Sequence, residues 1–97
     1  MDKAEIKRYL EKYNEIKAIV EFKKRKGLKE DRDVVCLSAV ESAIAILPNG
    51  LDQVLIKLYI QKQSLRYVGK KMYLTKDTVS RKRDKAIDML CSCLGDL

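Results

Sequence analysis

Basic side chains gather in one stretch of the sequence, residues 62–85. The chain of 97 residues has 21 lysines and arginines against 14 aspartates and glutamates, a formal net charge of +7. Residues 62–85 alone have the same net charge of +7, because Asp77 and Asp84 are their only acidic residues. These cations are Lys62, Arg66, Lys70, Lys71, Lys76, Arg81, Lys82, Arg83 and Lys85. Positive charge concentrated in this way favours binding to a polyanion, and a solvated helix face is the alternative.

Groups that carry catalysis or bind metals are scarce in this sequence. The chain has no histidine, the commonest general base and metal ligand. Cys36 stands apart from Cys91 and Cys93, and two thiols two residues apart on a helix point about 200° away from each other. The sequence has neither a phosphate-binding glycine loop nor a clustered carboxylate pair. We therefore expect no metal, no cofactor and no enzymatic activity.

Composition and length narrow the class of protein further. A chain that is 46% hydrophobic and 36% charged is typical of a globular fold, and its length suits one small fold. No apolar run approaches the roughly 20 residues of a membrane span, and the N-terminus has no apolar signal-peptide segment. The odd number of cysteines favours a reducing compartment. We expect a cytoplasmic protein with no membrane partner.

Residues 1–33 are expected to form an N-terminal helical arm and a charged connection. Apolar side chains at three- and four-residue steps predict one long amphipathic helix over residues 3–22. They are Ile6, Tyr9, Leu10, Tyr13, Ile16 and Val20. Packing of this helix against its own chain is preferred, and a homodimer through it is the alternative. The charged run over residues 23–33, with Gly27 in its middle, predicts the connection to the rest of the chain.

Residues 34–97 are expected to form a second unit, a helical domain. Residues 34–47 are small and apolar on more than one face, which predicts a helix that is the most buried element of the fold. Pro48 ends this helix. Asn49 and Asp52 resemble a capping pair for the next helix, which is expected to close with Gln-Lys-Gln before Ser64.

Two capped helices follow. Ser64 is a good N-cap for a helix over residues 65–72, and Thr75 for a helix that ends at about Leu94. Gly69 is expected where the two helices cross closely. The inward-facing positions are Leu65, Val68, Gly69 and Met72 in the first helix and Val79, Ala86, Ile87 and Leu90 in the second. The fold class is therefore all-α: a small domain of about five helices with a long amphipathic N-terminal helix and a C-terminal helix-turn-helix.

The run SLRYVGKKMYLTKDTVSRKRDKAIDML resembles region 4 of bacterial sigma factors. The preceding LPNGLDQVLIKLYI is similar to the helix before it in that family, so the likeness covers residues 47–90. With the N-terminal helix and the short length, the layout resembles small phage-encoded late-transcription regulators of the RinA/ArpU type. The resemblance implies a sequence-specific regulator of transcription that binds double-stranded DNA. Its helix starting at Thr75 would read the major groove, and RNA polymerase is a further partner.

The resemblance also implies roles for individual residues. The base-reading positions are Lys76, Asp77, Ser80 and Arg81. The phosphate-binding positions are Lys62, Ser64, Arg66, Lys70, Lys71, Thr75, Arg83 and Lys85. The chemistry suits these roles, because an arginine can donate two hydrogen bonds to guanine and an aspartate can accept one from cytosine. For Asp77, a favourable charge in the first turn of a helix is the alternative.

Two tyrosines lie within this motif. Packing is preferred over base stacking for Tyr67 and Tyr73. Tyr73 stands at the turn position where many members of the family have glycine. A left-handed backbone at this tyrosine would cost about 1 kcal/mol.

Two other functions are compatible with the sequence. The first is a protein-interaction module that docks on RNA polymerase or another acidic surface and dimerises through its arm. The second is the DNA-recognition subunit of a phage packaging machine.

Overall fold

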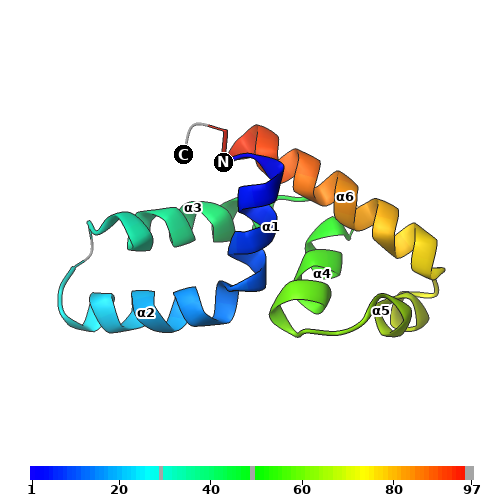
Figure 1. The fold of residues 1–97 in the computed structure, drawn as a ribbon, viewed down its shortest axis with the longest axis horizontal. Helices are drawn as coiled ribbons and strands as arrows, with labels where there is room; N and C mark the ends of the chain where they lie inside the picture. The colour runs from blue at the N-terminus through cyan, green and yellow to red at the C-terminus, as the bar shows by residue number, and fades with distance from the viewer. Residues whose placement is uncertain (29, 49, 96–97) are drawn as a thin grey trace.

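The regular elements of the chain are helices (Figure 1). The structure, a computed structural model, describes residues 1–28, 30–48 and 50–95. Its elements are α1 (Lys3–Glu11), α2 (Tyr13–Arg25), α3 (Arg32–Ala45), α4 (Leu51–Leu55), the π-helical turn η1 (Ile56–Ile60), α5 (Leu65–Met72) and α6 (Lys76–Cys93). These ranges contain no strand, and the all-α fold class is confirmed.

Two helices take the place of the single helix predicted over residues 3–22. Lys12 leaves helical geometry, with φ −100° and ψ 11°, and α1 and α2 run in different directions on either side of it (Figure 1). The ammonium group of Lys62 donates a hydrogen bond of 2.6 Å to the carbonyl oxygen of Glu11, the last residue of α1. Because the helix breaks here, α1 packs on α6 while α2 packs on α3.

The largest cluster of buried side chains lies along α6. Helices α1, α3 and α4 supply the other sides of this cluster. Its members are Ile6, Leu10, Val40, Ala43, Ile44, Leu47, Leu51, Leu55, Ala86, Ile87, Leu90 and Leu94. A smaller cluster joins α2 to α3 and consists of Tyr13, Val20, Val34 and Leu37. Helix α1 thus shares a core with the C-terminal helices, and the α2–α3 pair projects from that core (Figure 1).

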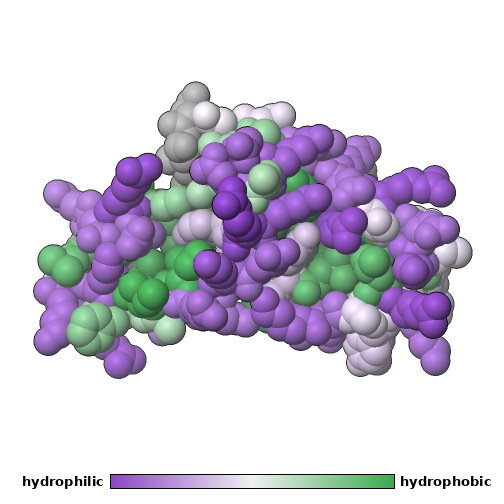
Figure 2. Space-filling model, in the orientation of Figure 1, coloured by the Kyte–Doolittle hydropathy of each residue, from purple (hydrophilic) through white to green (hydrophobic). Residues whose placement is uncertain are grey.

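Only one face of α3 is buried, although its apolar sequence predicts the most buried element. Helix α3 begins after Asp31, whose carboxylate accepts a hydrogen bond of 2.9 Å from the backbone N–H of Asp33. On its outward face, Val35 is 52% exposed and Ile46, at the C-terminal cap, 73% exposed. Figure 2 shows hydrophobic side chains at the surface over α2 and α3.

The helix that precedes the motif ends in a π-helical turn. Helix α4 begins after Gly50, which has a left-handed backbone with φ 76°, whereas its predicted cap, Asn49, lies outside the described residues. In η1 the N–H of Gln61 donates to the carbonyl oxygen of Ile56, five residues earlier, at 2.9 Å. Lys62 then reverses the chain with a left-handed φ of 56°. This reversal leads directly into α5.

Candidate nucleic-acid interface

Helix α5 has the limits predicted from its capping residue. The hydroxyl oxygen of Ser64 accepts a hydrogen bond of 3.1 Å from the N–H of Tyr67, which satisfies one of the free donors of the first turn. Val68 and Gly69 are buried against the rest of the fold. Val68 forms a small cluster with Val54 of α4 and Val79 of α6, and all three are fully buried. This cluster fixes α5 against α6.

The turn between α5 and α6 is tight. The N–H of Leu74 donates a hydrogen bond of 2.7 Å to the carbonyl oxygen of Gly69. A Cβ atom at Gly69 would lie 2.6 Å from the carbonyl oxygen of Leu74, closer than real contacts allow. Glycine is therefore required here by the backbone of the turn. The sequence predicted the need for a small residue but attributed it to the crossing of the two helices.

Tyr73 forms the turn in a left-handed conformation, with φ 58° and ψ 41°. Its side chain is 94% exposed, so the expectation that it packs in the fold was wrong. Tyr67 is also exposed, at 46%, and the ammonium group of Lys71 lies 5.6 Å from its ring centre. Their four-residue spacing on one helix could have indicated this cation–π pair.

Helix α6 begins at the capping residue that the sequence predicted. The Thr75 hydroxyl oxygen accepts a hydrogen bond of 3.2 Å from the N–H of Thr78, and the two hydroxyl groups lie 2.8 Å apart. The predicted inward positions of this helix are all buried: Val79, Ala86, Ile87 and Leu90. Burial of this stripe turns the opposite side of the first two turns outward.

Three of the four predicted base-reading residues lie on that outward side. Lys76, Asp77 and Arg81 are exposed, and the structure gives none of their side chains a hydrogen bond or an ion pair within the described ranges. Ser80 is half-buried, and its hydroxyl oxygen accepts a hydrogen bond of 3.1 Å from a terminal nitrogen of Arg83. The serine is thus tied to a neighbouring side chain.

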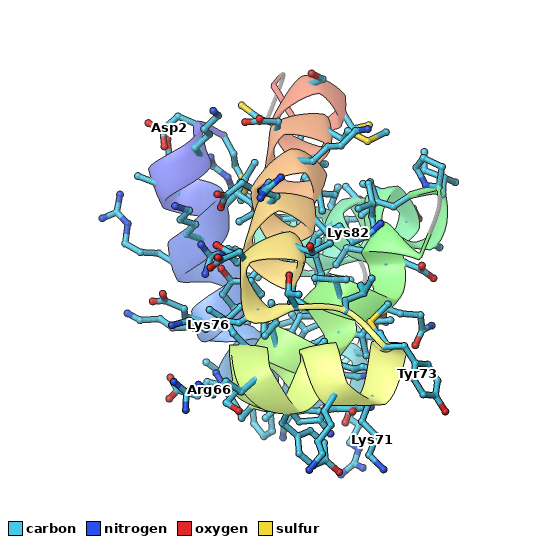
Figure 3. The ribbon with its side chains drawn as sticks, turned by 90° about the vertical axis from the view of Figure 1, so that its right-hand side faces the viewer. Asp2, Arg66, Lys71, Tyr73, Lys76 and Lys82 are labelled. Carbon is cyan, nitrogen blue, oxygen red and sulfur yellow. The ribbon has the colours of Figure 1, made fainter. Side chains whose placement is uncertain are left out.

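The predicted phosphate-binding residues divide into two groups. Arg66, Lys70, Lys71 and Lys85 are exposed on α5 and α6, while Ser64 and Thr75 stand at the N-terminal caps of these helices. Arg66 and Lys76, on the first turns of their helices, project toward the same side of the pair (Figure 3). Lys62 and Arg83 instead make bonds within the protein.

Arg83 is turned toward its own helix. Its Nε donates a hydrogen bond of 3.2 Å to the carboxylate of Asp84, in addition to the bond to Ser80. Burial raises the pKa of the Tyr59 hydroxyl, and the positive charge of Arg83 partly offsets this rise. The three-residue spacing of Ser80 and Arg83 on a helix could have indicated their contact. No sequence signal relates Lys62 to Glu11, because 51 positions separate them.

Aspartates alternate with the cations along the outward side of α6. Asp84 is bonded to Arg83, and Asp88 forms an ion pair with Lys3 of α1. Asp77 has no such partner within the described part of the chain. The exposed cations of α5 and of the first turns of α6 therefore have no carboxylate partner within the described part of the chain, and one unpaired carboxylate, Asp77, accompanies them.

The structure was also searched for membrane-spanning helices and metal sites, and the chain was compared with known proteins. Among residues 1–28, 30–48 and 50–95, no helix is both long enough and apolar enough to cross a bilayer. No three cysteine, aspartate or glutamate side chains in these ranges are grouped so that they could hold a metal ion. Comparison with protein-family models, curated proteins and solved structures finds no match to this chain.

Proposed function

We propose that the protein binds double-stranded DNA through the helix pair α5–α6 and regulates transcription. The observation that carries the proposal is the set of exposed cations without carboxylate partners on two helices that a tight turn holds together. The set consists of Arg66, Lys70, Lys71, Lys76, Arg81 and Lys85. Such cations bind the phosphates of a duplex, and a helix projecting its first turns can enter the major groove.

The arrangement supports a division of roles. Arg66 and Lys70 lie four residues apart on α5 and are suited to the phosphates on one side of the groove. Arg81 is suited to guanine, because its guanidinium can donate two hydrogen bonds to the major-groove edge of that base. Asp77 is suited to the amino group of cytosine, and it would repel phosphate wherever it did not meet such a donor.

The role in transcription, with RNA polymerase as a further partner, is supported by the resemblance of residues 47–90 to sigma factor region 4. A binding protein rather than an enzyme is supported by a sequence that lacks histidine. The hydroxyl groups of Ser64 and Thr75 are engaged as helix caps.

The first experiment is selection from a random duplex pool at about 150 mM salt, followed by sequencing of the retained DNA. We expect one short enriched motif. Retention without a motif would contradict sequence-specific reading. No retention at all would contradict DNA binding and would favour the alternative that the basic surface docks on a protein.

The salt dependence of binding tests the phosphate contacts separately. If about five cations meet phosphates, the logarithm of the binding constant falls with the logarithm of salt concentration with a slope of about −4 to −5. Lys70→Ala is expected to weaken binding to all sequences alike and to reduce this slope by about 1. Lys7→Ala is the matched control, because Lys7 is exposed on α1 outside the basic helix pair. An equal change of slope in both variants would contradict the assignment of α5 to the phosphates.

A further inference from the structure

The corner between α1 and α2 lies against the chain reversal that precedes α5. Here η1 packs on both helices of the corner. The ammonium group of Lys62 donates a hydrogen bond of 2.6 Å to the carbonyl oxygen of Glu11, and the side-chain amide of Asn14 donates one of 3.1 Å to that of Ile60. We call these two contacts the corner bonds. They join residues that are 51 and 46 positions apart in the sequence.

Each corner bond caps the end of a helical element. Glu11 is the last residue of α1, and Ile60 is the last residue of η1. Carbonyl groups at such an end have no hydrogen-bond donor ahead of them in their own helix. An ammonium group is especially suited to the end of α1, because the carboxyl end of a helix carries partial negative charge. The corner and the reversal therefore each satisfy a carbonyl group of the other.

Lys62 has a backbone conformation that does not favour lysine. Its φ of 56° is left-handed, which is unstrained for glycine and unfavourable for a residue with a Cβ atom. Its side chain is exposed, so burial does not compensate for this strain. Within the described ranges, the bond to Glu11 is the hydrogen bond that the Lys62 side chain makes. Lysine thus brings to this position a donor that glycine lacks.

The corner bonds lie next to the start of α5. Lys62 stands three residues before Leu65, the first residue of α5. Val68 and Gly69 fix the second half of this helix, whereas its first turn depends on the partly buried Leu65 and on the chain that leads into it. Arg66, a candidate phosphate ligand, is exposed on this first turn. Contacts that hold the reversal in place therefore also hold the backbone of Arg66.

We propose that Lys62 and Asn14 are positioning residues for α5, which support DNA binding by fixing its first turn and make no contact with DNA. The DNA-binding part of this inference rests on the proposed function. The resemblance to sigma factor region 4 begins at residue 47 and assigns Lys62 to a phosphate. Side chains that are held in place before binding lose less conformational entropy when DNA binds. The α1–α2 corner then belongs to the DNA-binding unit, although the sequence predicts residues 1–33 and 34–97 as separate units.

The first test needs no DNA and measures amide hydrogen exchange by nuclear magnetic resonance. In the first turn of α5, the N–H groups of Tyr67 and Val68 donate to the hydroxyl and carbonyl oxygens of Ser64, at 3.1 and 3.0 Å. Asn14→Ala and Lys62→Met each remove one corner bond, and each is expected to speed exchange of these two amides roughly 2- to 10-fold. Alanine favours a helix more than asparagine does, so faster exchange in Asn14→Ala reports the lost bond.

Two controls separate a local effect from a general loss of stability. Gln53→Ala removes an exposed side-chain amide of α4, away from the corner, and is expected to leave exchange in α5 unchanged. The N–H of Leu74, which donates to Gly69 at the other end of α5, is the internal reference. Unchanged exchange of the first-turn amides in both corner variants would overturn the proposal. Equal acceleration at Leu74 would also overturn it, because the effect would then not be local to the first turn.

The second test measures binding to the selected duplex by fluorescence anisotropy at several salt concentrations. Asn14→Ala and Lys62→Met are each expected to weaken binding roughly 2- to 10-fold without changing the slope against salt. Lys70→Ala, which removes a phosphate contact, is expected to reduce the slope by about 1. The same reduction in Lys62→Met, or unchanged affinity in both corner variants, would overturn the proposal. If the unaltered chain binds no duplex, the proposed function fails, and hydrogen exchange alone decides whether the corner positions α5.

Discussion

Lys23, at one end of the molecule, is paired with carboxylates, whereas the exposed cations of α5 and α6 at the other end are not. Where α2 meets α3, the ammonium group of Lys23 donates hydrogen bonds to the carboxylates of Asp31, at 3.0 Å, and Asp33, at 2.7 Å. At the other end, Arg66, Arg81 and their neighbours on α5 and α6 have no carboxylate partner within the described chain. Lys23 joins two helices, whereas the exposed cations of α5 and α6, like Lys24 and Arg25 beside Lys23, have no carboxylate partner among the described residues. The net charge of the chain does not distinguish a cation that is paired within the fold from one that is available to a ligand.

The turns at the two ends also differ. The α2–α3 connection contains Gly27, which has a left-handed φ of 81° and open space around the position of a Cβ. The α5–α6 turn gives its left-handed position to Tyr73 and needs a glycine at position 69 for space. Glycine is thus required by backbone conformation at one end and by contact at the other.

Replacing each of these two glycines by alanine tests this difference, and Gly69→Ala is expected to have the largest effect on stability. Gly69→Ala forces a Cβ to within 2.6 Å of the Leu74 carbonyl oxygen, and we expect a loss of about 2–3 kcal/mol in the free energy of unfolding. Gly27→Ala meets no atom and incurs only the strain of its positive φ, about 1 kcal/mol. Urea unfolding of both variants gives the comparison. Equal losses would contradict a tight turn at Gly69.

The location of the DNA-binding cations is tested by two exposed arginines, neither of which has an ion pair within the described chain. Arg81→Ala is expected to weaken binding to the best selected DNA site by about 1–3 kcal/mol and to relax base preference at one position. Arg25→Ala, at the exposed C-terminal end of α2, is the control and is expected to change little. Fluorescence anisotropy with the selected and a scrambled duplex measures both. If Arg81→Ala weakens both duplexes equally, Arg81 contacts phosphate and does not read a base.

The sequence predicts those parts of the fold that local chemistry determines. Ser64 and Thr75 each cap a helix because their hydroxyl groups satisfy backbone donors three residues ahead, and both helices begin as predicted. The break at Lys12 was missed because the apolar spacing continues through it. The bonds that accompany this break come from distant positions, Lys62 to Glu11 and Asn14 to Ile60. Periodicity within one segment contains no information about such partners.

In the candidate site, too, the sequence does not show which partners a side chain has. The sequence identifies cations but not their partners, so Lys76 and Arg83 look alike in it. In the structure Lys76 is exposed and unbonded, whereas Arg83 is bonded to Ser80 and Asp84. Tyr73 was expected to pack because base-stacking aromatic residues usually belong to sheets that bind single strands. Its position in the turn instead exposes it.

Tyr73→Gly is expected to stabilise the fold. The left-handed backbone at this position, φ 58° and ψ 41°, is strained for tyrosine and unstrained for glycine, and the exposed ring contributes little packing. We expect a gain of about 1 kcal/mol in the free energy of unfolding. Tyr73→Ala is the matched control, since it removes the ring but keeps the strain, and it is expected to give no gain. A gain of similar size in both variants would assign the effect to the ring.

The smallest effect concerns the paired cation at the α2–α3 end. The Lys23 ammonium, and then the backbone N–H of Asp33, hold the pKa of Asp31 below its ordinary value. The folded state therefore binds this proton less tightly than the unfolded state. The contribution to stability is present at neutral pH and is lost as the pH falls below about 4. Thermal unfolding from pH 7 to pH 2.5 measures this loss.

Asp31→Asn keeps the N-terminal cap of α3, because the side-chain oxygen of asparagine also accepts from the Asp33 N–H. It removes the titrating carboxylate. We therefore expect a slightly lower melting temperature at pH 7 and a smaller decrease of the melting temperature between pH 7 and pH 2.5. Lys23→Gln removes the cation that lowers the pKa of Asp31. It is likewise expected to make the decrease of the melting temperature in acid smaller. If either variant loses stability in acid as steeply as the unaltered chain, the Lys23–Asp31 pair does not stabilise this end of the fold.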